Sequence, residues 1–308
     1  MPPDRPRRWL PAVLFLATLC TTTAAGIFWY TGFVDRPLSD ATGLLGILTD
    51  PSYLLGGLSF SLAILIILIA HELGHYLTCV RYGIRASLPH LLPVPPFAFG
   101  FPLNPFGTFG AVIRIRSPFE NKRQLFDIGI AGPLAGFVFI IPALILGLAH
   151  SREFVLEGSE GFYLNFGEPL LFKLAARLLV GNETAYITLH PVGWAAWFGM
   201  LATSLNLLPV GQLDGGHIVY AVLGPRWHRI VSIGTLTGLV VLGAATFSIS
   251  YILFAALIFL LAFRHPAPVW DYPPLDAKRI ILAIVALIIL VLTFIPEPVE
   301  VVEYTNHL

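Results

Sequence analysis

Residues 54–80 read LLGGLSFSLAILIILIAHELGHYLTCV, an apolar run whose only charged or imidazole side chains are His71, Glu72 and His75. About 20 consecutive apolar residues are enough to cross the hydrocarbon core of a bilayer as a helix. The run therefore predicts a transmembrane helix. Ionisable groups inside such a helix are costly and usually functional, so these three side chains are the first candidates for chemistry.

The rest of the chain has the same apolar character. Of its 308 residues, 56% are hydrophobic and 12% are charged, which is about half the charged fraction of a soluble domain. This composition excludes a cytosolic enzyme, a disordered protein and a nucleic-acid-binding protein. We predict an all-α polytopic membrane protein with about seven transmembrane helices. The predicted spans are 9–33, 54–80, 125–149, 188–209, 229–246, 247–264 and 280–296.

The charges are distributed unequally between the two sides that these spans define. Basic residues concentrate in segments such as 5–8, 81–85, 114–123 and 278–279, whereas acidic residues collect in the alternate connections. By the positive-inside rule, the N-terminus is predicted to be cytoplasmic and the C-terminus outside. The run 9–33 is predicted to be an uncleaved anchor rather than a signal peptide. The lack of an Arg/Ser-rich leader favours a prokaryotic plasma membrane over an organelle.

One connection has an unusual composition. From Ala86 to Ile113 it contains no Asp, Glu, Lys or Arg, while Pro and Phe recur. A Pro-rich segment cannot form a spanning helix, and irregular backbone at membrane depth needs protein or a wet cavity beside it. We predict a re-entrant or interfacial loop with a small β element, because residues 111–116 alternate as a strand does. A second connection predicts an amphipathic helix at 168–180.

Two histidines four residues apart on a helix lie on one face, where both rings can bind a single Zn²⁺. Glu72 is adjacent and can act as a base on a metal-bound water. A catalytic zinc site needs a third protein ligand, and the candidate is Asp214 in the segment NLLPVGQLDGGH at 206–217. Asp214 and the histidines lie toward the same membrane face. His217 is the competing ligand.

These motifs resemble those of a known family. HELGH at 71–75, with NLLP at 206–209 and LDGG at 213–216, looks like the paired signatures of the site-2 proteases, which are intramembrane zinc metalloproteases. FDIGIAGPLAG at 126–136 is similar to the stretch between them. The resemblance covers roughly residues 60–220 and indicates a short form without a PDZ or CBS domain. It implies zinc bound by His71, His75 and Asp214, Glu72 as the catalytic acid/base, and Asn206 as an oxyanion stabiliser.

Three regions follow from this interpretation. They are an N-terminal anchor helix and external loop (1–53), a catalytic intramembrane core (54–220) and C-terminal transmembrane helices (221–308). Within the core, Gly132 and Gly136 form a GxxxG pattern that predicts close helix packing. Gly74 is expected to give room beside the metal, and Asp127 is expected to be an N-cap or interface anchor.

The substrate implied by the resemblance is a transmembrane protein in a lipid bilayer. Glu72 would take a proton from the attacking water and pass it to the leaving amine. Because a peptide bond inside a helix is shielded, the substrate must unwind, and a strand edge can pair with the extended segment. The candidate substrate-binding residues are Ala111, Val112, Ile113, Arg114 and Ile115.

Three other classes of protein share some of these features. A cation or proton-coupled transporter can use buried His, Glu and Asp residues, but the chain lacks an inverted repeat. A zinc-bound but inactive scaffold would not need Glu72. A CAAX-type intramembrane protease shares the HExxH pattern but would take its third ligand from a glutamate, and no later span offers a suitable one.

Overall fold

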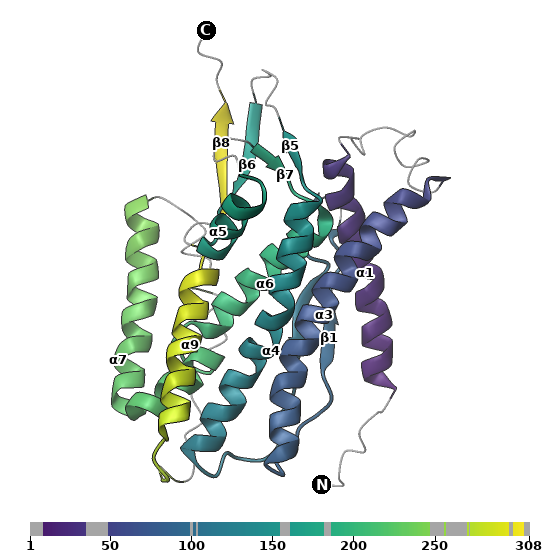
Figure 1. Cartoon of the computed structure of the whole chain (residues 1–308). Coiled ribbons are helices and arrows are strands. Elements are labelled where there is room, and N and C mark those ends of the chain that lie inside the picture. Colours follow the sequence, from purple (N-terminus) through teal and green to yellow (C-terminus); the bar gives the residue numbers. More distant parts are fainter. Residues whose placement is uncertain are drawn as a thin grey trace.

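The computed structural model describes residues 9–34, 49–98, 101–102, 104–154, 161–181, 186–246, 256, 270, 272–295 and 298–304. This part of the chain is mostly helical (Figure 1). The helices are α1 (Leu10–Phe33), α3 (Pro51–Arg81), α4 (Lys122–Ala149), α5 (Leu170–Leu179), α6 (Pro191–Leu207), α7 (Asp214–Thr246) and α9 (Ala277–Thr293). The strands are β1 (His90–Pro93), β2 (Phe97–Ala98), β3 (Phe101–Pro102), β4 (Thr108–Val112), β5 (Arg152–Phe154), β6 (Gly161–Phe166), β7 (Tyr186–Thr188) and β8 (Val299–Tyr304).

Four helices of the described chain are long and apolar enough to cross a membrane, namely α1, α3, α4 and α7. The predicted helical membrane protein with a small β element is therefore confirmed, but the count of seven crossings is not. Helices α6 and α9 have 17 residues each, which is short of the usual length. Helix α6 ends early because Pro209 follows it and Gly211 adopts a φ of 50°. The predicted span 247–264 lies almost wholly outside the described residues.

Helices α3 and α4 form the centre of the bundle, with α1 on one side and α7 and α9 on the other (Figure 1). Small residues let the helices approach closely. A Cβ added to Gly26 of α1 would lie 2.5 Å from the carbonyl oxygen of Gly57 on α3. Next to this contact the hydroxyls of Thr22 and Ser61 are hydrogen-bonded at 2.5 Å. Such contacts replace the hydrophobic driving force that helices lack inside lipid.

The core lies between α1, α3, α4 and α6. Phe60, Ile140 and Met200 are fully buried in it. The outer faces of the same helices are also apolar, since Leu62 and Ile66 of α3 are about half exposed. Large exposed apolar surfaces are unusual on soluble monomers, so this pattern is typical of helices that face lipid.

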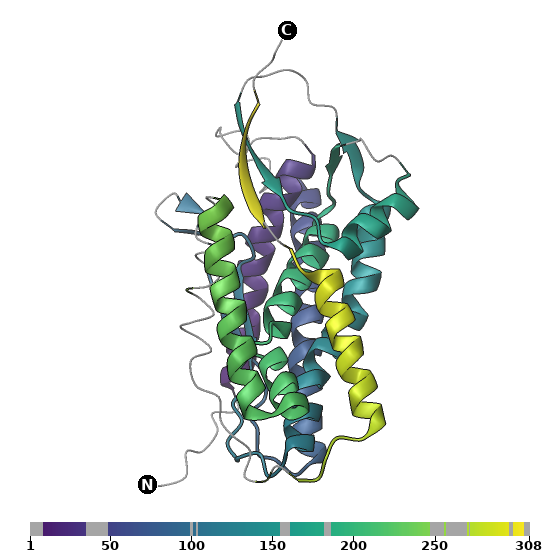
Figure 2. The same cartoon turned by 90° about the vertical axis from the view of Figure 1, so that its left-hand side faces the viewer.

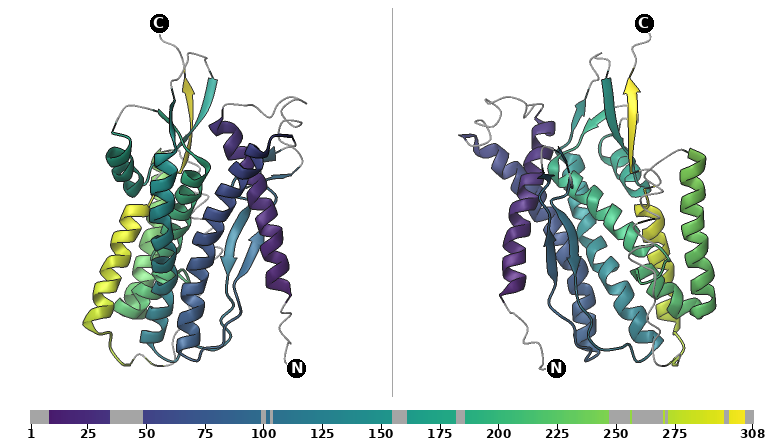
Figure 3. Two further views of the ribbon diagram at one scale, coloured as in Figure 1. Left: turned by 45° about the vertical axis from the view of Figure 1, so that its right-hand side comes forward. Right: turned by 180° about the vertical axis from the view of Figure 1, so that it is seen from behind.

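Strands β1 and β4 form an antiparallel hairpin between α1 and α3 (Figure 3). The predicted strand at 111–116 is therefore shifted, because β4 covers 108–112 and Ile115 makes only an isolated bridge to Ala86. The pairing starts early because the Thr108 hydroxyl donates to the Leu92 carbonyl at 2.9 Å. Alternation of side chains sets the faces of a strand, but its ends depend on the partner strand.

The end of the bundle at which α4 finishes carries two strand pairs that were not predicted from the sequence (Figure 1). Strand β8 pairs with β6 along six residues, and β5 pairs with β7. Figure 2 shows β6 and β8 projecting beyond the helices. The predicted amphipathic helix is confirmed as α5, which packs on α4 and α9 and buries Phe172 in the core.

At the end of the bundle away from these strand pairs, a polar cluster joins the end of α3 to the first turns of α4 and α9. The Arg279 guanidinium donates two hydrogen bonds to Asp127, at 2.8 and 2.6 Å, and the Tyr82 hydroxyl donates to the same carboxylate. Asp127 is therefore not the N-cap of α4. Asn121 has that role, because its side chain accepts a hydrogen bond from the Gln124 N–H.

Candidate metal centre and active site

The two histidines of the HELGH motif lie in the last third of α3 with their rings together. Their Nε2 atoms are 3.1 Å apart, and both residues are buried. The rings meet edge to face, with centroids 4.8 Å apart. The i, i+4 spacing predicted this arrangement, since such residues are neighbours on a helix surface.

Asp214, the first residue of α7, reaches the same point from a distant part of the chain. Its Oδ2 atom lies 3.2 Å from Nε2 of His71 and 3.3 Å from Nε2 of His75. These three residues form the one group among the described residues whose potential ligand atoms lie within 4.8 Å of one another. His217, the competing candidate, is not a member of it.

The spacing of these three atoms fits a zinc ion. Tetrahedral ligands at about 2.0–2.2 Å from zinc lie roughly 3.4 Å from one another, and the observed separations are 3.1 to 3.3 Å. Two imidazoles and one carboxylate are also a donor set that catalytic zinc sites use. The residues present therefore fit the metal.

The orientation of the His75 ring supports the same conclusion. Its Nδ1 atom lies 2.6 Å from the carbonyl oxygen of Ile128 on α4, and a carbonyl can only accept. We assign the Nδ1 proton on this ground, so that Nε2 of the neutral ring carries a lone pair. Metal-bound histidines usually donate their second N–H in this way. The lone pair then points toward the Asp214 carboxylate and the His71 imidazole. A cation held between these three groups would stabilise this arrangement.

Helix α4 makes room for the two rings through its glycines. A Cβ added to Gly132 would lie 2.0 Å from Nε2 of His75, and one added to Gly136 would lie 3.3 Å from Cβ of His71. The GxxxG pattern was predicted to allow close helix packing, and both glycines do lie against α3, where they leave room for the histidine side chains. Gly74 was predicted to give room beside the metal, but it faces the backbone of α4, because its added Cβ would lie 2.4 Å from the Ala131 carbonyl oxygen.

The loop that delivers Asp214 is anchored by the far half of α7. Helix α7 bends at Gly224, where φ is 82°, and returns past the loop. There the His228 ring contacts the Gly211 carbonyl at 3.2 Å. The Ser232 hydroxyl donates to the Pro209 carbonyl at 3.2 Å and accepts from the Gly211 N–H at 3.3 Å. Neither His228 nor Ser232 was predicted from the sequence, because only the bend brings them to the loop.

Glu72 and Asn206 border the three-residue group. The amide Nδ2 of Asn206 lies 3.5 Å from Nε2 of His71. Glu72 is partly buried, and its carboxylate lies beside the backbone N–H of Ile113. The structure thus brings the predicted base and the predicted oxyanion stabiliser to the same place as the potential metal ligands.

The candidate substrate strand runs past Glu72. Ala111 and Val112 end β4, and Arg114 bonds to Ser87 through both its N–H and its carbonyl, at 2.9 and 3.0 Å. Because successive residues of a strand point their backbone groups to opposite edges, Ile113 points away from Ser87 and toward Glu72. In the described structure no strand pairs with this second edge of β4.

A carboxylate-and-histidine metal site inside membrane-crossing helices defines the class of membrane metalloproteases, and comparisons with known proteins give the same class. The model of peptidase family M50 matches residues 59–250. The chain belongs to this family, which is the site-2 protease family. The predicted family, the zinc metalloprotease class and zinc as cofactor are therefore confirmed.

Several plant proteins are similar to this chain. It is 30% identical over 280 residues to "Probable zinc metalloprotease EGY1, chloroplastic" of Arabidopsis thaliana, covering 88% of this chain and 45% of the relative. The corresponding EGY2 protein is 30% identical over 290 residues, covering 89% and 49%. The chain thus spans about half the length of these relatives. Their names do not support the predicted prokaryotic membrane, and the transporter alternative is not favoured.

Proposed function

We propose that this protein is a zinc-dependent intramembrane protease, which hydrolyses peptide bonds within or near the transmembrane segments of membrane-protein substrates in regulated intramembrane proteolysis. The observation that carries the proposal is the convergence of His71, His75 and Asp214 beside Glu72, on helices long enough to span a membrane. The catalytic core would comprise residues 54–220, between the anchor region 1–53 and the C-terminal helices 221–308.

In this proposal the two histidines and Asp214 hold the zinc ion. Bound zinc supplies Lewis acidity, which activates water and polarises a carbonyl group. Glu72 accepts the proton of the attacking water and passes it to the leaving amine. The Asn206 amide, which already lies near His71, donates a hydrogen bond to the oxyanion. The Ile128 carbonyl keeps the His75 ring oriented throughout.

The substrate would bind as an extended segment along the free edge of β4 and of the residues that follow it. On this edge, between Ala111 and Ile115, the residues that alternate with Arg114 offer backbone groups to a pairing strand. The position of the Ile113 N–H beside Glu72 supports this role, since a segment paired there has its backbone next to the base. The chain would thereby unwind a substrate helix before cleavage.

The proposed orientation places the N-terminus in the cytoplasm and the C-terminus outside, in the plasma membrane of a prokaryote. The end of α3 and the starts of α4 and α9 lie at one end of the bundle, and they carry Arg81, Lys122 and Lys278 (Figure 1). This clustering is what the positive-inside rule requires. Single-cysteine variants at these sites and in α5 would test it, because a membrane-impermeant thiol reagent should label only one set in intact cells.

The decisive test of the activity is cleavage of a membrane-spanning substrate by the purified protein in lipid. The wild type should cleave it and Glu72→Gln should not, although both proteins should contain zinc. Glu120→Gln, which changes a carboxylate at the membrane edge near α4, is the matched control and should retain cleavage. Cleavage that survives Glu72→Gln would overturn the proposal.

A further inference from the structure

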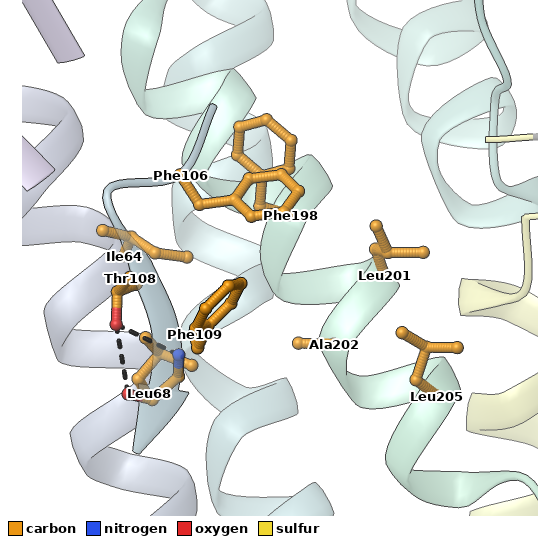
Figure 4. A pocket seen from close by; sticks show the side chains of 10 residues that line it. Ile64, Leu68, Phe106, Thr108, Phe109, Phe198, Leu201, Ala202 and Leu205 are labelled. Carbon is orange, nitrogen blue, oxygen red and sulfur yellow. Dashed lines mark hydrogen bonds between the residues drawn. The ribbon is translucent and has the colours of Figure 1, made fainter. Parts of the chain in front are cut away.

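An apolar cavity of about 180 Å³ lies between α3, β4 and α6 (Figure 4). Its walls are Ile64 and Leu68 from α3 and Ala202 and Leu205 from α6. Phe109 of β4, whose side chain is 73% exposed, stands opposite Ala202 at the side of the cavity. No step of the proposed chemistry uses this space.

The described side chains that line the cavity are almost wholly apolar. Thr108 is its one lining residue with a polar side chain, and the Thr108 hydroxyl is already bonded to the carbonyls of Leu92 and Gly110, at 2.9 and 3.1 Å, and to the Gly110 N–H. At one end Phe106 packs on Phe198, with ring centroids 3.9 Å apart. A group that enters this cavity must therefore be apolar.

Residues that line the cavity lie close to the active-site residues along the chain. Leu68 lies one helical turn before His71, and Leu205 directly precedes Asn206. Gly110, which also lines the cavity, lies three residues before Ile113, whose N–H lies beside Glu72. Three residues of extended chain span about 10 Å. A segment that follows the free edge of β4 therefore passes both the cavity and the catalytic base.

We propose that this cavity is a specificity subsite, which takes one large apolar side chain of the substrate about three residues from the scissile bond. The inference rests on the proposed function, because it needs a substrate segment paired with β4. A cavity of about 150 Å³ is known to hold a benzene ring, so the observed volume suits a Leu- or Phe-sized side chain. The apolar character of transmembrane substrates supplies such side chains.

The test uses a set of transmembrane substrates that differ at single positions around the cut, with Trp, Phe, Leu, Ala or Asp at each. Wild-type protein should prefer Phe or Leu at one position about three residues from the cut. Ala202→Leu narrows the cavity and should lower kcat/KM for the Phe substrate about tenfold or more, with little effect on the Ala substrate. Ala244→Leu, the same change on the exposed face of α7, should leave the preference unchanged.

Two further measurements keep the proposal falsifiable. Leu205→Ala enlarges the cavity and should shift the preference toward Trp. In the Glu72→Gln background, a photo-crosslinking residue in place of Phe109 should capture the substrate through the same position. An unchanged preference in both cavity variants, with zinc content retained, would overturn the subsite. A wild type that cleaves no substrate, while the crosslink still forms, would instead overturn the proposed function.

Discussion

Gly132 of α4 faces the His75 ring so closely that an added methyl carbon would lie 2.0 Å from Nε2. Real side chains do not approach this closely, and the atom in question is a potential metal ligand. Gly132→Ala should therefore push the ring away from His71 and Asp214. We expect loss of bound zinc, measured by elemental analysis, and loss of cleavage.

Two other glycines provide graded controls for that change. Gly136→Ala brings a methyl group 3.3 Å from Cβ of His71, so its effect on zinc should be smaller. Gly234→Ala meets nothing within 4 Å and should keep full zinc content. Equal zinc content in the Gly132 and Gly234 variants would show that the ring has room to move.

Substitutions of Asp214 and of Glu72 should differ in their effects on zinc binding. Asp214→Asn removes the charge of a potential ligand and should weaken zinc binding by more than about 100-fold, since even outer partners of metal ligands are worth 10- to 100-fold. Glu72→Gln should keep zinc and lose cleavage. Asp276→Asn preserves a helix cap and should lose neither. Retention of zinc by Asp214→Asn would contradict the ligand assignment.

Removal of the metal should be reversible. Chelation of wild-type protein is expected to abolish cleavage and to lower Tm, because a bound ligand stabilises the folded state that binds it. Added zinc should restore both. If neither chelation of the wild type nor the Asp214→Asn substitution changed Tm, this would indicate that no metal links α3 to α7.

The anchoring of the Asp214 loop by α7 is a further prediction. Ser232→Ala removes the hydroxyl that bonds to both Pro209 and Gly211, and it should lower zinc affinity about tenfold. The effect should appear in zinc affinity more than in Tm. Thr237→Ala removes an exposed hydroxyl from the same helix and serves as the control. Equal zinc affinities in the two variants would contradict the positioning role.

The Arg279–Asp127 pair should stabilise the fold without taking part in catalysis. Both side chains are only about one-fifth exposed, at 19% and 21%. Burial and the hydrogen bond to Asp127 raise the pKa of Tyr82, so its hydroxyl stays protonated and donates to this carboxylate. Because hydrogen bonds to charged groups contribute about 1.5–3 kcal/mol, Arg279→Ala should lower the free energy of unfolding by that amount.

A double-mutant cycle measures this contact directly. Arg279→Ala combined with Asp127→Asn should destabilise by less than the sum of the two single changes, since either one already breaks the pair. Lys278→Ala alters the exposed neighbouring residue and should change the free energy of unfolding little. Additive effects of the Arg279 and Asp127 changes would show that the pair contributes nothing.

The sequence by itself determined the helical membrane class, the family and the pairing of His71 with His75, because apolar run length and i, i+4 spacing are local properties of a helix. It also indicated Asp214 as their partner. The tertiary structure decided what depends on contacts between distant segments. These include the room that Gly132 leaves for the His75 ring and the anchoring of the Asp214 loop by Ser232. They also include the ends of β4 and the pairing of β6 with β8. Such features follow from how helices cross and bend, which no local pattern of residues encodes.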